Sequence, residues 1–188
     1  DGLYASVAEV IERVGNDQLR IYLYHIPPIA QVGFSVDLIE RLVTDYPKTV
    51  VGIKDSSGDW ANTAAMLDRQ WDDFRVFVGS ESFLLANMQN GGAGCISATA
   101  NINPAAIDRL YREWDGNDAV AMQADLDRIR SVVADYPMIP ALKATVASFS
   151  GDDAWCTVRP PLVALSEEER SKLVASLQKK RFEMPGLS

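Results

Sequence analysis

Apolar residues along this chain follow two spacings, and the spacing decides which kind of element each stretch predicts. A stretch with helical spacing covers residues 2–14, with apolar side chains at Leu3, Val7, Val10, Ile11 and Val14. Residues 20–26 predict a strand that ends at the Pro27-Pro28 pair, because proline cannot continue a hydrogen-bonded ladder. Residues 49–54 form a β-branched run without alternation, which is typical of a strand buried on both faces of a parallel sheet.

The alternation of strands and helices continues to residue 97. Ser35 is a good N-cap for a helix through about Tyr46. Further strands are expected over residues 74–78 and 94–97, and further helices over residues 60–70 and 82–90. The strand–helix units recur at intervals of roughly 25 to 30 residues, which favours parallel strands joined by right-handed crossovers.

After Asn101 the pattern predicts only helices. They are expected over residues 104–114, 118–136 and 141–148, and a last one begins with a capping box at Ser166 and Glu169. We therefore divide the chain into residues 1–103, which contain the strands, and residues 104–188, which are helical. Four parallel strands in a row would be half of an eight-stranded barrel.

Composition narrows the class of protein. The 188 residues are 47% hydrophobic and 23% charged, enough apolar material for a sizeable core. A net charge of −8 argues against nucleic acid and anionic membranes as partners, and no apolar run is long enough for a transmembrane helix. Cys95 and Cys156 lie far apart and there is one histidine, so we expect reduced thiols, a cytoplasmic location and no metal site.

Lys54 is the strongest candidate for chemistry. It ends the apolar run 49–54 and is followed at once by the polar loop Asp55-Ser56-Ser57-Gly58. Barrel and open α/β enzymes keep their active groups at this end of their strands. Apolar walls favour the neutral amine, which is a nucleophile that forms Schiff bases with carbonyl compounds. From this segment alone, a lysine that extends to solvent remains an alternative.

Several short segments together resemble one enzyme family. In chain order they are Tyr24-His25-Ile26-Pro27, Gly52-Ile53-Lys54-Asp55, Gly79-Ser80-Glu81, residues 92–101, residues 140–144 and residues 159–162. Their order and spacing resemble the dihydrodipicolinate synthase / N-acetylneuraminate lyase family of pyruvate-type class I aldolases. The resemblance covers nearly the whole chain.

The resemblance implies an α/β fold, namely the C-terminal half of a (β/α)8 TIM barrel followed by a C-terminal helical region. Residues 1–103 would be the second half of the barrel, and residues 104–188 would pack on it. The family's Gly-Glu and paired-hydroxyl motif would lie in an N-terminal half that this chain lacks. Because the chain also has no initiator methionine, we expect it to be processed or partial and to need that half, since half a barrel exposes its strand edges.

By resemblance, Lys54 attacks the ketone of a 2-oxo acid and forms an iminium that accepts electrons, so no separate cofactor is implied. Tyr24 would move protons, with hydroxyls of the missing half as its relay. Strand spacing alone leaves two alternatives, since Tyr22 has the same parity and Tyr24 could be a purely structural aromatic residue. His25 has the opposite parity and is expected to be structural.

Four further residues are predicted to line the substrate pocket. Backbone groups of Gly79 and Ile96 would approach the substrate closely. Ser56 and Glu81 resemble the positions that bind substrate hydroxyls in the sugar-acid lyases, where an acceptor-only carboxylate suits a polyol. A solvated loop acid remains the alternative for Glu81.

Departures from the family pattern bear on the substrate. Ile29 stands where the dihydrodipicolinate synthases have an arginine that binds the second substrate. Ala98 and Ser82 stand where the sialic acid lyases have a serine and a second acid. We therefore expect reversible aldol cleavage of a 2-keto-3-deoxy sugar acid, or a sialic-acid-like substrate, to pyruvate and an aldehyde. The alternatives are dihydrodipicolinate synthase-type condensation, sugar-acid dehydration and a non-catalytic relative.

The late helices also carry apolar residues that suggest an interface. They are Leu110, Trp114, Met122, Leu126, Ile129 and Val133. Packing on the barrel is the simpler interpretation, whereas the resemblance implies a homo-oligomer, either a dimer or a tetramer.

Overall fold

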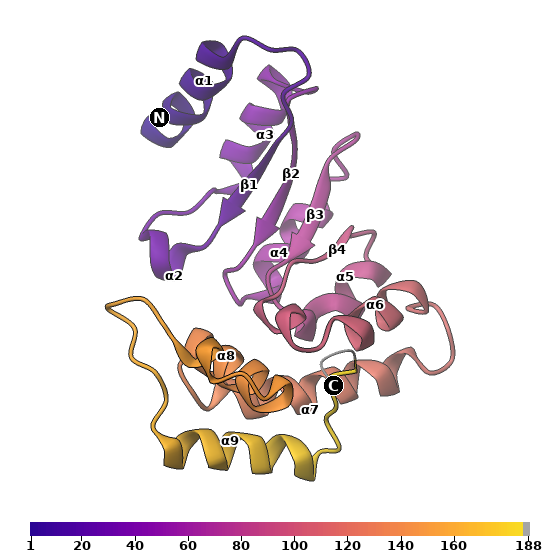
Figure 1. Cartoon of the computed structure of the whole chain (residues 1–188). Coiled ribbons are helices and arrows are strands. Elements are labelled where there is room, and N and C mark those ends of the chain that lie inside the picture. Colours follow the sequence, from indigo (N-terminus) through magenta and orange to yellow (C-terminus); the bar gives the residue numbers. More distant parts are fainter. Residues whose placement is uncertain (186–188) are drawn as a thin grey trace. The chain divides into compact units, whose positions relative to one another are not determined.

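Four parallel strands form a single sheet in the order β1-β2-β3-β4 in the computed structural model, which describes residues 1–185 (Figure 1). The strands are β1 (Ile21–His25), β2 (Val50–Asp55), β3 (Arg75–Val78) and β4 (Gly94–Cys95). All four agree with the strands predicted from the sequence, although β4 is shorter than expected. The order follows the chain, so each strand pairs with the strand that precedes it in the sequence.

Helices precede and separate the strands in the first part of the chain. They are α1 (Gly2–Val14), α2 (Pro27–Ala30), α3 (Val36–Asp45), α4 (Trp60–Leu67), the 3-10 turn η1 (Glu81–Phe83) and α5 (Leu84–Gln89). The Ser35 side chain caps α3 by accepting a hydrogen bond from the Leu38 amide, as predicted. Helix α2 is not among the predicted elements, because Pro27-Pro28 is typical of a strand end, whereas proline also suits the first turn of a helix.

The two faces of the sheet differ. One face packs against helices and forms a core cluster of Leu23, Ile39, Leu42, Val50, Ile53, Met66 and Val76. The other face carries Tyr22 and Tyr24, which are 46% and 49% exposed. The sequence predicts that β2 is buried on both faces. Within the described residues, helices cover only one of these faces, so the prediction holds for that face alone. The more open face is the one that Lys54 shares with Tyr24.

The chain divides into two compact units, Asp1–Ile96 and a second unit that begins at Ser97. The second unit contains η2 (Ala98–Asn101), α6 (Pro104–Arg112), α7 (Ala119–Ala134), α8 (Met138–Ser150), η3 (Asp153–Cys156) and α9 (Glu167–Lys179). The predicted capping box is present, since Ser166 and Glu169 each bond the other's backbone amide. Helix α8 begins earlier than expected because Pro140 lies within its first turn.

The apolar residues of the late helices pack within the second unit. Leu110, Leu126, Ile129 and Val133 are all buried. Ile129 and Val133 belong to a cluster that joins α7, α8 and α9. These four side chains therefore serve packing, and they do not support the interpretation that they form an oligomer interface.

The buried carboxylate of Asp55 anchors the loop after β2. Its Oδ1 accepts a hydrogen bond from the Ser57 amide at 2.9 Å, and its Oδ2 accepts from Asn62 Nδ2 at 3.0 Å and from Thr63 Oγ1 at 2.7 Å. The side chain is only 4% exposed, so these donors replace the water that a carboxylate would otherwise need. The loop that carries Ser56 is thereby tied to α4.

Replacing Thr63 with valine tests this anchor. Thr63→Val keeps the shape of the side chain but removes one donor from a buried carboxylate, so we expect the free energy of unfolding to fall by about 1–3 kcal/mol in a denaturant titration. Thr44→Val is the matched control, because the Thr44 hydroxyl bonds only a backbone carbonyl on an exposed helix face. Equal losses in the two variants would contradict an anchoring role for Asp55.

Candidate active site

Lys54 and Tyr24 meet at the carboxyl ends of neighbouring strands. They are register partners across β1 and β2, two strands that lie side by side in Figure 1. Lys54 Nζ donates a hydrogen bond to Tyr24 Oη at 3.0 Å and lies 4.2 Å from the centroid of the ring. An amine that contacts a phenol can exchange protons with it, so this pair can combine a nucleophile with a general acid and base. The two residues predicted to be catalytic are therefore in contact.

Tyr22 has a different environment although it lies on the same face. Its ring lies over Gly52, where an added Cβ would collide with it. It also makes an edge-to-face contact with Phe77, with 5.8 Å between the ring centroids. The Tyr22 ring thus lies across Gly52 of β2 and packs against Phe77 of β3. The geometry favours Tyr24 over Tyr22 as the partner of Lys54.

The surroundings of Tyr24 lower the pKa of its phenol below the usual range. The largest cause is the hydrogen bond from Lys54. Partial burial acts in the opposite direction, and the Ser56 side chain and the charge of Lys54 lower the pKa further. The phenolate, which is the basic form, is therefore reached at a lower pH than in an isolated tyrosine.

Ser56 is held between the last residue of β1 and the residue that follows β3. Its amide donates to the His25 carbonyl at 2.7 Å, and the Gly79 amide donates to the Asp55 carbonyl at 2.7 Å. The Ser56 side chain occupies the space where a Cβ of Gly79 would be, so only glycine allows this approach. Sequence reasoning proposed Ser56 and Gly79 separately, and the structure places them in contact.

The remaining predicted residues differ in how exposed their side chains are. They are Glu81, Ile96 and His25. Glu81 is 2% exposed at the start of η1, so the alternative of a solvated loop acid is wrong. Ile96 donates its amide to the Val78 carbonyl at 2.9 Å, while its side chain is 47% exposed. His25 is buried and its Nδ1 accepts a hydrogen bond from the Phe34 amide at 3.0 Å, which agrees with a structural role.

The sequence analysis missed Asp55 as a supporting residue of the site. The available signal was an aspartate followed by two serines and a glycine, a composition typical of a side-chain-capped turn. Its donors Asn62 and Thr63 could not be identified from spacing alone, because they come from the following helix.

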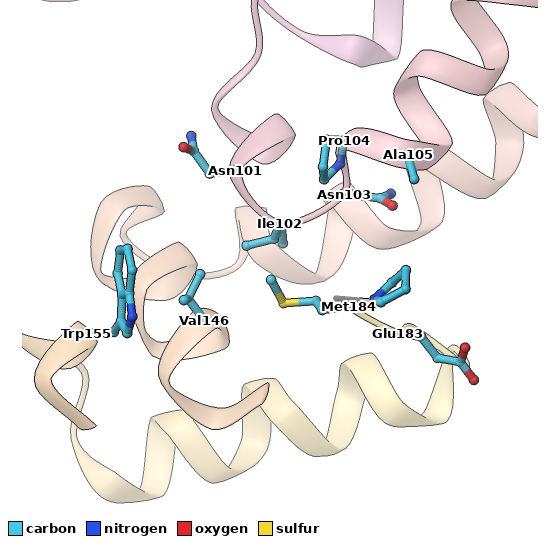
Figure 2. Close-up of a pocket in the computed structure, with 10 residues that line it drawn as sticks. Asn101, Ile102, Asn103, Pro104, Ala105, Val146, Trp155, Glu183 and Met184 are labelled. Atoms are coloured by element: carbon cyan, nitrogen blue, oxygen red, sulfur yellow. The ribbon is translucent and has the colours of Figure 1, made fainter. Parts of the chain in front are cut away.

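A separate cavity of about 330 Å³ lies in the second unit (Figure 2). It is lined by Asn101, Ile102, Asn103, Pro104, Ala105, Val146, Trp155, Glu183, Met184 and Pro185. Figure 2 shows Trp155 and Val146 on one side and Met184 and Glu183 on another. No lysine, tyrosine or histidine is among these lining residues, so the cavity lacks the reactive pair found in the first unit.

Residues 1–185 contain neither a cluster of metal-ligating side chains nor a helix that could span a membrane. No group of three or more histidine, cysteine, aspartate or glutamate side chains in this part of the chain could hold a metal ion. Within the same residues, no helix combines the length and apolar character needed to cross a bilayer.

Comparisons with known proteins agree on one family. A model described as the dihydrodipicolinate synthetase family matches residues 1–180. An uncharacterized DapA-like lyase of Chloroflexus aurantiacus is 32% identical over 161 residues, which cover 85% of this chain and 53% of the relative. The 4-hydroxy-tetrahydrodipicolinate synthase of Zymomonas mobilis is 31% identical over 189 residues, which cover 97% of this chain and 62% of the relative.

A solved structure extends the similarity to the fold. The crystal structure of dihydrodipicolinate synthase from Agrobacterium tumefaciens matches with a TM-score of 0.83 and 32% identity, over 95% of this chain and 60% of that one. This match confirms the predicted fold, in which the second half of a TIM barrel is followed by helices. The chain spans between 53% and 62% of the length of these relatives.

The tyrosines should titrate over a wide range of pH. The hydrogen bond from Tyr4 to Asp45 raises the pKa of Tyr4 to about 12, whereas Lys54 lowers that of Tyr24. Ultraviolet absorbance of the phenolate against pH should therefore show one early-titrating tyrosine, which is absent in Tyr24→Phe. In Lys54→Met this tyrosine should titrate at higher pH, while Lys48→Met should leave it unchanged. An early phase that survives Lys54→Met unaltered would disprove this assignment.

Proposed function

The chain belongs to the dihydrodipicolinate synthetase family, and from this premise we propose that it carries the catalytic lysine and tyrosine of a Schiff-base-forming lyase. The observation that supports the proposal most directly is the 3.0 Å contact between Lys54 Nζ and Tyr24 Oη. The substrate is a 2-oxo acid, and the reaction is reversible aldol cleavage to pyruvate and an aldehyde.

In the first step the neutral amine of Lys54 attacks the ketone carbon of the substrate and forms a carbinolamine. Tyr24 gives its phenolic proton to the carbinolamine hydroxyl, which leaves as water. The products of this step are an iminium on Lys54 and a phenolate on Tyr24. The cation and the anion form side by side, so each lowers the energy of the other.

Cleavage then uses the phenolate. Tyr24 takes the proton of the C4 hydroxyl, the C3–C4 bond breaks, and its electron pair moves into the iminium to give an enamine and a free aldehyde. The phenol returns a proton to C3 of the enamine, which regenerates an iminium. Water adds to this iminium while Tyr24 accepts one of its protons, and pyruvate leaves Lys54. The iminium itself is the electron sink, so the proposal assigns no further cofactor.

The remaining residues would select the substrate. Ser56 and Glu81 would face the hydroxyls of a 2-keto-3-deoxy sugar acid, and the backbone of Gly79 and Ile96 would line the pocket. Condensation of the dihydrodipicolinate synthase type is the second candidate, because the Zymomonas mobilis relative carries that name. Ile29, 76% exposed on α2 at the position of the synthases' arginine, favours the sugar acid.

The proposal concerns a complete barrel. The relatives are longer than this chain, and in the proposal the additional part of the barrel supplies the substrate carboxylate site and further hydroxyls. We further propose a cytoplasmic homo-oligomer. The experiments below therefore use the longest natural form of the protein in which this chain occurs.

Borohydride reduction in the presence of pyruvate tests the Schiff base. We expect a stable pyruvyl adduct on Lys54, identified by intact-mass and peptide mass spectrometry. Lys54→Ala should abolish the adduct without unfolding the protein, while Lys48→Ala, which removes an exposed lysine just before β2, should retain it. No adduct in a folded wild-type protein would favour a non-catalytic relative or a different substrate class.

Tyr24→Phe tests the proton transfer. Loss of the phenolic hydroxyl should lower kcat by about a hundredfold or more, the range of general acid–base contributions. The KM for the 2-oxo acid should change little. Tyr22→Phe is the matched control and should keep near-wild-type turnover, since the Tyr22 ring serves packing. Analysis of the wild-type products distinguishes aldol cleavage from sugar-acid dehydration, because an aldolase releases pyruvate and an aldehyde and a dehydratase does not. Equal effects on binding and turnover would argue against a proton-transfer role.

A further inference from the structure

The side chain of His25, the last residue of β1, holds the segment that follows this strand. We call that segment, residues 26–34, the α2 loop. The imidazole is buried, and its Nδ1 accepts a hydrogen bond from the Phe34 amide at 3.0 Å. A nitrogen that accepts carries no proton, so the ring is neutral and its proton lies on Nε2. Because the Phe34 side chain packs against the core cluster of the first unit, His25 is bonded to a fixed end of the α2 loop.

Gly33 brings the returning end of the α2 loop against the same ring. A Cβ added at Gly33 would lie 2.7 Å from His25 Cε1 and 3.3 Å from Pro27 Cγ. The first of these distances is shorter than any ordinary contact, so glycine is needed here for close approach. The start of the loop, its end and the imidazole therefore pack together, and the ring closes the base of the loop.

Helix α2, which lies within the α2 loop, has no buried anchor of its own. It consists of four residues, Pro27–Ala30, and none of their side chains is buried. A helix this short is not stable in isolation. Its place at the carboxyl end of β1 (Figure 1) therefore depends on the closure of the loop. Ile29, which is 76% exposed on α2, takes its position from that closure.

The main chain of His25 joins the α2 loop to the strands that carry the reactive pair. His25 directly follows Tyr24 and is the register partner of Asp55, at the end of β2. Its carbonyl accepts a hydrogen bond from the Ser56 amide at 2.7 Å. Barrel enzymes bind their substrates at this end of their strands. Since successive residues of a strand point to opposite faces, the His25 ring acts on this region without facing the reacting atoms.

We propose that His25 is a positioning residue for substrate selection, whose neutral imidazole closes the α2 loop and thereby holds Ile29 against the aldehyde part of the substrate. This inference rests on the proposed function and deepens it, because it identifies the group that fixes the selective loop. In the proposed reaction pyruvate is bonded to Lys54, whereas the aldehyde lies beyond it. Loss of the closure should therefore weaken binding of the aldehyde and spare pyruvate.

Condensation of pyruvate with D-glyceraldehyde, the reverse of the proposed cleavage, measures the two substrates separately. His25→Leu removes the acceptor and should raise the KM for glyceraldehyde by about tenfold, the factor expected for one lost hydrogen bond. The KM for pyruvate and the yield of the borohydride-trapped adduct should stay close to those of the wild type. His25→Asn has the same branched outline as the leucine variant but places an oxygen where Nδ1 stands, so it should restore the KM for glyceraldehyde.

A double-mutant cycle tests whether His25 acts through Ile29. Ile29→Ala alone should raise the KM for glyceraldehyde several-fold, because apolar contact is lost. In the His25→Leu background the same change should add little, since the side chain is no longer held in place. Val10→Ala is the matched control, because Val10 is an exposed β-branched residue on α1, and it should leave the KM unchanged in both backgrounds.

Gly33→Ala perturbs the closure independently and serves if His25→Leu does not fold. The added methyl group would collide with Cε1 of the imidazole, so the KM for glyceraldehyde should again rise while pyruvate trapping is retained. Asparagine has no atom at the position of Cε1. The double variant His25→Asn with Gly33→Ala should therefore recover most of the loss.

The outcomes distinguish this inference from the proposed function. If the folded wild type forms no pyruvate adduct or consumes no glyceraldehyde, the proposed function itself fails. If the wild type does both, and His25→Leu or Gly33→Ala keeps the wild-type KM for glyceraldehyde, the positioning role is overturned. Additive effects of His25→Leu and Ile29→Ala overturn it as well. An equal rise in the KM values for pyruvate and glyceraldehyde overturns it in favour of a histidine that only supports the fold.

Discussion

The register between β1 and β2 is the constraint on which the site depends. It pairs Tyr24 with Lys54, and a shift by one residue would turn one of them toward the helix-covered face. Two residues earlier the same register places the Tyr22 ring over Gly52, where any other side chain would collide with it. The aromatic packing of Tyr22 on Phe77 therefore stabilises the alignment that brings the amine to the phenol.

Two adjacent residues at the carboxyl end of β2 have different roles, one in the proposed chemistry and one in the structure of the loop. Lys54 faces the open side of the sheet, whereas Asp55 is buried on the other side with three hydrogen-bond donors. Successive residues of a strand point to opposite faces. Lys54 can therefore take part in the reaction, while Asp55 anchors the loop that follows the strand. Ser56 then starts a loop whose course is determined by Asp55. The buried carboxylate thus acts on the site without contacting the reacting atoms.

Periodicity was sufficient for most of the elements but not for every detail of the site. The strands and most helices follow from local apolar spacing, and the resemblance to a known family identified Lys54 and Tyr24 as a pair. Parity could not choose between Tyr22 and Tyr24, since both share a face. The burial of Glu81 and the donors to Asp55 depend on which segments pack together, which no local pattern contains. Helix α2 was missed because two prolines are compatible with both a strand end and a helix start.

Two tyrosines of this chain show why the partner, and not the residue type, decides the chemistry. Tyr4 donates to the carboxylate of Asp45, which raises its pKa to about 12 and keeps it a neutral phenol. Tyr24 accepts from the ammonium of Lys54, which lowers its pKa and favours the phenolate. Neither ring is deeply buried, so desolvation is not the deciding cause. A basic phenol therefore depends on a cation at hydrogen-bond distance, and in this chain the register of two strands places that cation beside Tyr24.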